Sequence, residues 1–322
     1  MGTKGWLNQT YKRFRDDSIP GAVAKTLYDV YLGGLMSVSS RREIGTNFYS
    51  KEWDLLIILD ACRVDALREV APEFDFIDDV SSIWSVGSSS EEWMANTFTE
   101  PHREEIRQTA YVTYNTFTER VLRNGERPPV TKSVPQWTNW KTLHTDDFGL
   151  IDEVWRDAWD DEVNTVQPRP VTDRAIHAHR QSDASRLMVH YGQPHAPYLE
   201  RPDGEMARTY WPELRRGEME IEDAWEYYID NLRLVLQDVK ILLENVDAPR
   251  VIITADHGEA FGEWGILTHP TGMPHPVVRK VPWAETEATD ERTHTVEISE
   301  ADETNVTSKE VNQRLESLGY KV

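Results

Sequence analysis

Residues 53–59 form a nearly continuous apolar stretch that ends at Asp60, and this stretch constrains the fold more than any other part of the chain. Such stretches are typical of strands that are covered on both faces, as in a parallel sheet flanked by helices. The sequence predicts further strands at 74–86, 109–114, 185–191 and 249–255, and helices at 61–70, 91–98 and 224–244. Strands that alternate with helices indicate an α/β fold with a mostly parallel central sheet and helices on both faces.

Polar side chains follow the ends of these predicted strands. They are Asp60, the serines of 88–90, His190, His195, Asp256, His257, Glu259 and, shortly after, His269. Ligands of open α/β sheets bind beyond the carboxyl ends of the strands. Carboxylates and imidazoles are suited to a divalent cation, although each residue alone has a plainer interpretation as a helix cap or a core histidine. Their combination predicts a metal site at this edge of the sheet.

Five short motifs resemble, in the correct order, the alkaline phosphatase superfamily, specifically its sulfatase-like and phosphoethanolamine-transferase-like branch. They are Ile-Leu-Asp-Ala-Cys-Arg-Val-Asp at 58–65, Gly-Ser-Ser-Ser at 87–90, the segment from His190 to Pro197, Thr-Ala-Asp-His-Gly-Glu at 254–259, and Gly265 to His269. The resemblance covers about residues 52–283. It implies an alkaline-phosphatase-like fold and an enzyme that hydrolyses or transfers a phosphate or sulfate ester.

The same resemblance implies a nucleophile and a set of metal ligands. Ser90 matches the position of the transferases' threonine nucleophile, although Ser88 and Ser89 flank it and a serine-rich turn can simply cap a helix. A divalent cation would lower the pKa of the Ser90 hydroxyl and so activate it, which counts Ser90 among the metal ligands. The other ligands implied are Asp60, Asp256 and His257.

Four further residues receive roles from the resemblance. His195 and His269 would neutralise the oxygens of the reacting group or assist the leaving group. His190 and Arg63 are candidates for substrate binding, although an ion pair with Asp65 is the plainer interpretation of Arg63. Glu259 would contact and orient the metal ligands without binding the metal itself.

The types of donor atom indicate which metal ion is bound. One difference from the two-metal phosphatases of this superfamily indicates how many ions there are. Zinc suits a mixture of carboxylate and imidazole best, with manganese, calcium or magnesium as alternatives. Tyr191 stands where two-metal phosphatases of this superfamily have aspartate, which predicts one principal cation. Cys62 is the only cysteine and is followed by Arg63, so it is not the modified residue of formylglycine sulfatases, and the chain has no internal disulfide.

The substrate class stays open between a small molecule, a lipid headgroup and a glycan carrying the ester. Hydrolysis and transfer share their first half-reaction, so the motifs do not separate them. The alternative to an enzyme is a non-catalytic protein of the same fold, which binds a metal or an anion in surface-glycan or glycosylation metabolism. The presence of both a nucleophile and buried metal acids argues for the enzyme.

Charge and hydropathy exclude several classes of protein. The 56 acidic residues outnumber the 35 basic ones, giving a formal charge of −21, which disfavours nucleic acid as a partner. An acidic surplus with few lysines resembles the proteins of salt-loving archaea, and the plainer alternative is an ordinary acidic cytosolic protein. With no apolar stretch of about 20 residues to span a bilayer and no signal-peptide core, we expect a cytoplasmic protein.

The chain divides into three predicted parts, which are an N-terminal helical arm at 1–50, the catalytic domain at 51–283 and an acidic tail at 284–322. The arm contains a predicted helix at 20–36, and its residues 1–40 either rest on the inner membrane face or on a partner, or pack on the domain itself. We expect packing on the domain, since Asp16, Asp17 and Asp29 weaken the basic face. In the tail we expect a short helix at 308–318 with Ser308 as its N-cap.

Overall fold

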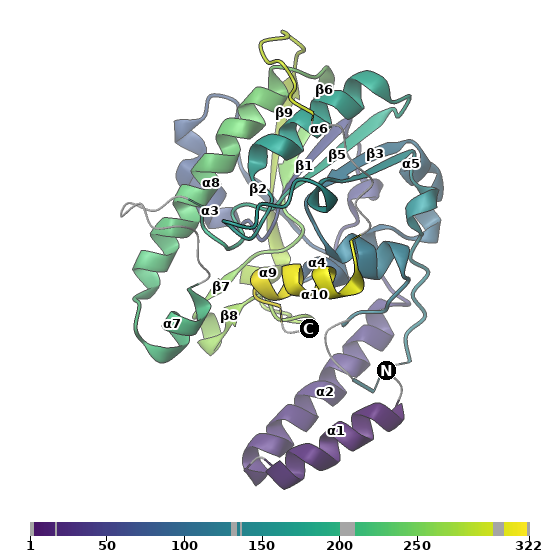
Figure 1. Cartoon of the computed structure of the whole chain (residues 1–322), viewed down its shortest axis with the longest axis vertical. Coiled ribbons are helices and arrows are strands. Elements are labelled where there is room, and N and C mark those ends of the chain that lie inside the picture. The colour runs from purple at the N-terminus through teal and green to yellow at the C-terminus, as the bar shows by residue number, and fades with distance from the viewer. Residues whose placement is uncertain are drawn as a thin grey trace.

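A seven-stranded mixed sheet forms the centre of the computed structural model (Figure 1), which describes residues 3–16, 18–129, 134–135, 137–199, 210–298 and 306–320. The strand order is β2-β9-β6-β1-β5-β3-β4. The bounds are β1 (Leu55–Leu59), β2 (Ser81–Trp84), β3 (Thr109–Thr113), β4 (Leu150–Glu153), β5 (Arg186–Tyr191), β6 (Ala248–Thr254) and β9 (Lys280–Ala288). A separate small sheet pairs β7 (Ala260–Phe261) with β8 (Leu267–Thr268).

The sheet is mostly parallel, as the sequence predicts. Strands β6, β1, β5, β3 and β4 run parallel to one another, while β9 pairs antiparallel with β6, and β2 antiparallel with β9. All five residues of β1 are buried. The apolar run at 53–59 therefore has the environment that its composition predicts, between two parallel neighbours and beneath helices.

Helices surround the sheet (Figure 1). α6 (Pro168–Gln181) packs against β5 and β3 and against α8 (Ile221–Leu243), whose apolar stripe faces the core. The other helices of the main body are α3 (Val64–Val70), α4 (Ser90–Thr97), α5 (Arg103–Arg107), α7 (Trp211–Arg216), α9 (Pro276–Arg279) and α10 (Ser308–Ser317). Two N-terminal helices, α1 (Thr3–Asp16) and α2 (Ile19–Ser39), lie side by side and project from this body.

Two expectations about the elements need correction. The strand predicted at 74–86 is only the short antiparallel edge strand β2. The boundary drawn at residue 283 falls inside β9, because residues 284–288 belong to the sheet. Glu285 and Glu287 point to solvent there, which is how an acidic stretch can form a strand.

The terminal helix is confirmed, but its cap is not Ser308. The Thr307 hydroxyl accepts a hydrogen bond from the backbone N–H of Glu310 and closes a capping box. Val311 and Leu315 are buried in the main core, so α10 packs on the catalytic body. Residues 299–305 and 321–322 of the expected tail, and residues 1–2 and 17 of the arm, lie outside the described residues.

No helix in the described part of the chain has the combined length and apolar character that crossing a membrane requires.

Candidate active site

Adjacent strands bring three ligand-type side chains to one point beyond the carboxyl ends of the sheet. Asp60 follows β1, Asp256 follows β6 and His190 lies near the end of β5, and β1 pairs with both of the other strands. One ligand atom from each residue lies within 4.8 Å of the other two. All three residues are completely buried. As predicted, Asp60 and Asp256 therefore lie close together at one edge of the sheet.

The buried atoms at this point lack partners, which is what a cation site requires. Asp60 Oδ1, Asp256 Oδ2 and His190 Nε2 have no hydrogen-bond partner among the described residues. Buried polar groups are almost always paired, and buried charges are paired or coordinate a metal. The other carboxylate oxygen of Asp256 is satisfied, since it accepts from the backbone N–H groups of Ala61 (3.1 Å) and His257 (2.9 Å). The donor set thus fits a divalent cation.

His257 and Ser90 complete this cluster. His257 Nε2 lies 3.3 Å from Asp256 Oδ2 and 3.6 Å from Asp60 Oδ1, while its Nδ1 lies 3.0 Å from the carbonyl oxygen of Gly258. A proton on Nδ1 would bind that carbonyl and leave the Nε2 lone pair facing the acids. Ser90 Oγ lies 3.2 Å from Asp60 Oδ2 and 3.3 Å from His257 Nε2. The structure therefore brings Ser90 to the predicted metal ligands.

The three serines of the turn have different environments. Ser88 Oγ donates to the Glu92 carboxylate at 2.9 Å, and Ser89 Oγ bonds to Thr271 Oγ1 at 3.2 Å. Both hydroxyls therefore anchor the turn to its surroundings. Of the three, only Ser90, the first residue of α4, directs its hydroxyl toward Asp60 and His257.

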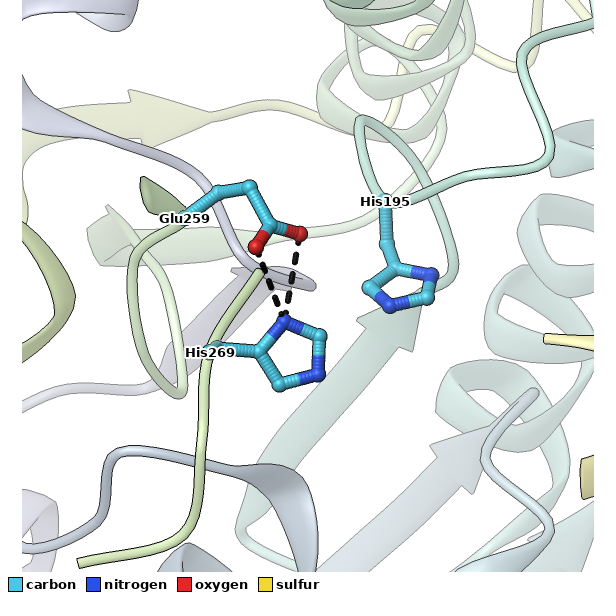
Figure 2. Close-up of side chains that lie close together, drawn as sticks. All are labelled: His195, Glu259 and His269. Atoms are coloured by element: carbon cyan, nitrogen blue, oxygen red, sulfur yellow. Dashed lines mark hydrogen bonds and ion pairs between the residues drawn. The ribbon is translucent and has the colours of Figure 1, made fainter. Parts of the chain in front are cut away.

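A second group lies beside the first and consists of His195, Glu259 and His269 (Figure 2). His269 Nδ1 lies 3.1 and 3.2 Å from the two Glu259 oxygens, and the His257 and His269 ring centroids are 4.3 Å apart. Burial raises the pKa of Glu259 to about 7, and burial lowers the pKa of His269 to about 3. His269 is therefore neutral near pH 7. This second group could also hold a cation, so the expectation of one principal metal stays a prediction.

Sequence reasoning missed two residues that hold Asp60. The Tyr114 hydroxyl donates to Asp60 Oδ2 at 2.5 Å, and Asn115 Nδ2 donates to the same oxygen at 3.1 Å. Burial, reinforced by the Asp60 charge, raises the pKa of Tyr114 well above its usual value, so the phenol keeps the proton that it donates. Both residues directly follow β3. The rule that ligands gather at strand ends, applied to this strand as well, would have found them.

A third missed residue comes from the C-terminal segment. The Tyr320 hydroxyl lies 3.1 Å from His269 Nε2, and its ring stacks on His195 with centroids 6.0 Å apart and an interplanar angle of 3°. Phe117 holds the other side of the ring edge-on, at 4.8 Å between centroids. Tyr320 follows α10, which crosses the site end of the sheet (Figure 1). No motif signalled this contact.

The two residues assigned to substrate binding lie differently from one another. Arg63 makes ion pairs with Asp65 at 2.5 Å and with Glu263 at 2.7 Å, so the ion-pair interpretation of Arg63 is the one that the geometry supports. His190 directs Nε2 toward Asp60 at 3.5 Å, and its Nδ1 bonds to the Tyr111 hydroxyl at 2.9 Å. His190 thus groups with the metal-ligand candidates.

Comparison with known proteins gives matches among solved structures only, since no family model and no curated protein matches the chain. Integral membrane phosphoethanolamine transferase EptA from Neisseria meningitidis has a TM-score of 0.49 and 13% identity, over 74% of this chain and 48% of that one. The periplasmic domain of EptC from Escherichia coli in complex with Zn has a TM-score of 0.44 and 12% identity, over 85% of each chain. A putative sulfatase from Bacteroides thetaiotaomicron has a TM-score of 0.38 and 13% identity, over 83% of this chain and 71% of that one.

These matches correct the expected location. We expected a cytoplasmic protein, and this was wrong, because the matched domains of EptC are periplasmic. The chain spans about half the length of the EptA protein that it matches. At 12–13% identity the likeness concerns the fold alone. The structure has a mostly parallel α/β sheet with helices around it, and its likeness to these phosphoethanolamine transferases and to the sulfatase is one of fold.

Proposed function

We propose that this protein is a metal-dependent enzyme that transfers or hydrolyses a phosphate or sulfate ester, with Ser90 as its nucleophile. One observation carries the proposal. Three buried ligand atoms without hydrogen-bond partners converge at the carboxyl end of the sheet, and the Ser90 hydroxyl lies 3.2 Å from one of the two acids that supply them. Two unneutralised carboxylates at one buried point cost several kcal/mol unless a cation or a proton compensates them.

The metal would be held by Asp60, Asp256 and His257, with His190 beside them. Carboxylate and imidazole donors suit zinc, while manganese, calcium and magnesium remain alternatives. When bound, such a cation lowers the pKa of a hydroxyl next to it and stabilises negative charge on the reacting group. Tyr114 and Asn115 support this site because both donate to Asp60 Oδ2 and so leave Oδ1 directed at the cluster.

Ser90 would carry the ester chemistry. Its Oγ forms a new bond to phosphorus or sulfur while the bond from that atom to the leaving oxygen breaks, and the serine proton passes to a neighbouring base. Asp60 Oδ2, 3.2 Å from the Ser90 hydroxyl, is near enough to accept it. In a second step, water or an acceptor hydroxyl takes the group from Ser90. The enzyme is a hydrolase if the acceptor is water and a transferase if it is another hydroxyl.

His195 and His269 are suited to the oxygens of the transferred group or of the leaving group. The His269 ring lies beside His257, with 4.3 Å between centroids, and the His195 ring lies beside His269, with 5.0 Å between centroids. The substrate would be a small molecule, a lipid headgroup or a glycan that carries the ester. A non-catalytic anion-binding role remains the second candidate, but it gives no reason for a serine hydroxyl directed at the buried Asp60 and His257.

Zinc-loaded protein assayed on a phosphodiester, a phosphomonoester and a sulfate ester tests the proposal. Ser90→Ala should lose at least about 10²–10⁴-fold in turnover, while the metal acids keep their cation. Ser89→Ala is the matched control, since its hydroxyl belongs to the same turn but bonds to Thr271, and it should keep most of the activity. Full activity of Ser90→Ala on a substrate that the wild type turns over would contradict the covalent mechanism.

A further inference from the structure

The hairpin formed by α1 and α2 exposes large apolar side chains on both of its helices, and we name this set the hairpin face. In each helix they recur at intervals of three or four residues or at multiples of one turn, so each set lies on one side of its helix. Their side chains are between 41% and 73% exposed, and they are Leu7, Tyr11 and Phe14 on α1 and Ile19, Val23, Leu27, Val30, Tyr31 and Val38 on α2. The hairpin projects from the body of the molecule (Figure 1).

The expectation that the arm's helix packs on its own domain holds for one side of α2 only. On the other side, Val23, Leu27 and Val30 are 41%, 64% and 49% exposed. The opposite side of α2 is the one that packs, since Leu32 and Met36 are buried with Val134. A helix that is apolar on all sides is normally buried on all sides, and a large exposed apolar patch marks an interaction site.

The charge of the hairpin is opposite to that of the rest of the chain. Residues 3–39 contain five Lys or Arg and three Asp, a formal charge of +2, whereas the other 285 residues together carry −23, which gives the total of −21. Asp29 does not weaken the outer surface, because it is buried between α1 and α2 and pairs there with Arg13 and Trp6. Lys12 and Lys25 are exposed on the hairpin.

The base of the hairpin touches the loop that follows His269. The Tyr28 hydroxyl donates to the carbonyl oxygen of Thr271 at 3.2 Å, and the Tyr31 hydroxyl donates to that of Gly272 at 2.9 Å. Thr271 in turn bonds to Ser89, one residue before the proposed nucleophile. The hairpin therefore joins the body at the same end of the sheet as the candidate active site.

We propose that the hairpin face docks on an anionic lipid surface. Interfacial helices combine Leu, Phe, Trp or Tyr on one face with Lys and Arg around it, and α1 and α2 supply this combination. The positive charge of the hairpin matches anionic headgroups, and Lys or Arg near such a surface strengthens binding. Pairing with a second hairpin would bring two positive charges of the same size together, which disfavours a second copy as the occupant. The inference stands independently of the ester chemistry.

Sedimentation of the full chain with vesicles tests the docking. The wild type should bind vesicles of phosphatidylcholine with phosphatidylglycerol, and bind pure phosphatidylcholine vesicles more weakly. The double variant Tyr11→Glu/Leu27→Glu should bind at least about tenfold less to both. Lys12→Glu/Lys25→Glu should lose at least about fivefold on the anionic vesicles only.

Ile221→Glu is the control, because Ile221 is an apolar side chain 42% exposed at the start of α8, away from the hairpin. It should bind vesicles like the wild type, and thermal unfolding should show that every variant is folded. Equal vesicle binding by wild type and Tyr11→Glu/Leu27→Glu would overturn the proposal. So would wild-type protein that ignores the vesicles but forms dimers that the same variant abolishes in sedimentation equilibrium.

Discussion

Replacing Glu92 with glutamine removes one charge from a buried ion pair that holds the turn of Ser90. Arg279 Nη2 lies 2.6 Å from Glu92 Oε1, and the two side chains are 4% and 0% exposed. The other oxygen, Oε2, accepts from the Ser88 backbone at 3.0 Å, the Ser88 hydroxyl at 2.9 Å and the Gly272 backbone at 3.1 Å. One carboxylate thus binds the serine turn, the loop after His269 and α9 together.

The expected cost follows from what glutamine leaves behind. Glu92→Gln conserves the volume but leaves the Arg279 guanidinium buried without a counter-charge, and it sets an amide NH₂ against a donor. Removing one partner of a buried ion pair typically costs about 3–5 kcal/mol. We therefore expect Glu92→Gln to lower the free energy of unfolding by about that amount.

Urea denaturation of both variants measures this cost against a matched exposed pair. Glu73 and Arg233 form the same kind of ion pair at 2.8 Å, but their side chains are 44% and 38% exposed. Glu73→Gln should therefore cost no more than about 1 kcal/mol, since exposed pairs contribute little. If Glu92→Gln also costs less than about 1 kcal/mol with an unchanged denaturant dependence, the buried pair does not hold the turn as described.

Three further expectations concern the site itself. Tyr320→Phe removes the hydroxyl near His269 but keeps the ring on His195, so turnover should fall by up to about tenfold with unchanged thermal stability, and steady-state kinetics showing no change would contradict this. Tyr114→Phe removes the hydrogen bond to Asp60 and should weaken metal affinity by about 10–100-fold in titration calorimetry, whereas wild-type affinity would refute a supporting role. Chelation with EDTA should abolish turnover and added zinc should restore it, and activity that survives chelation would exclude metal dependence.

The parts of the fold that the sequence predicts well are those with one dominant signal. The apolar stretch that forms β1 and the stripe of α8 report their own burial, because a covered strand or helix face needs a continuous apolar surface. Residues 284–288 were not predicted to form a strand, because exposed Glu285 and Glu287 make this part of β9 resemble a solvated linker. In such a strand the buried side chains are few, and only the neighbouring strand decides the structure.

For the site too, the sequence predicts the residues that carry a strong local signal and misses those that do not. Asp60 and Asp256 carry recognisable motifs directly after strong strands, so their meeting follows from the parallel topology. Tyr320 lies 51 residues from His269 in the chain, and no local pattern announces a contact over that separation. The exposure of Val23 and Leu27 was equally hidden, because α2 is apolar on both sides and composition does not say which side packs.

The position of the metal relative to Ser90 tests the central claim most directly. Crystals grown with zinc, measured at the zinc absorption edge, would locate the cation by its anomalous scattering. The account predicts a strong peak about 2 Å from ligand atoms of Asp60, Asp256 and His257, with Ser90 Oγ next to it. A peak confined to His195, Glu259 and His269, or turnover by crystals that hold no metal between the two acids, would contradict it.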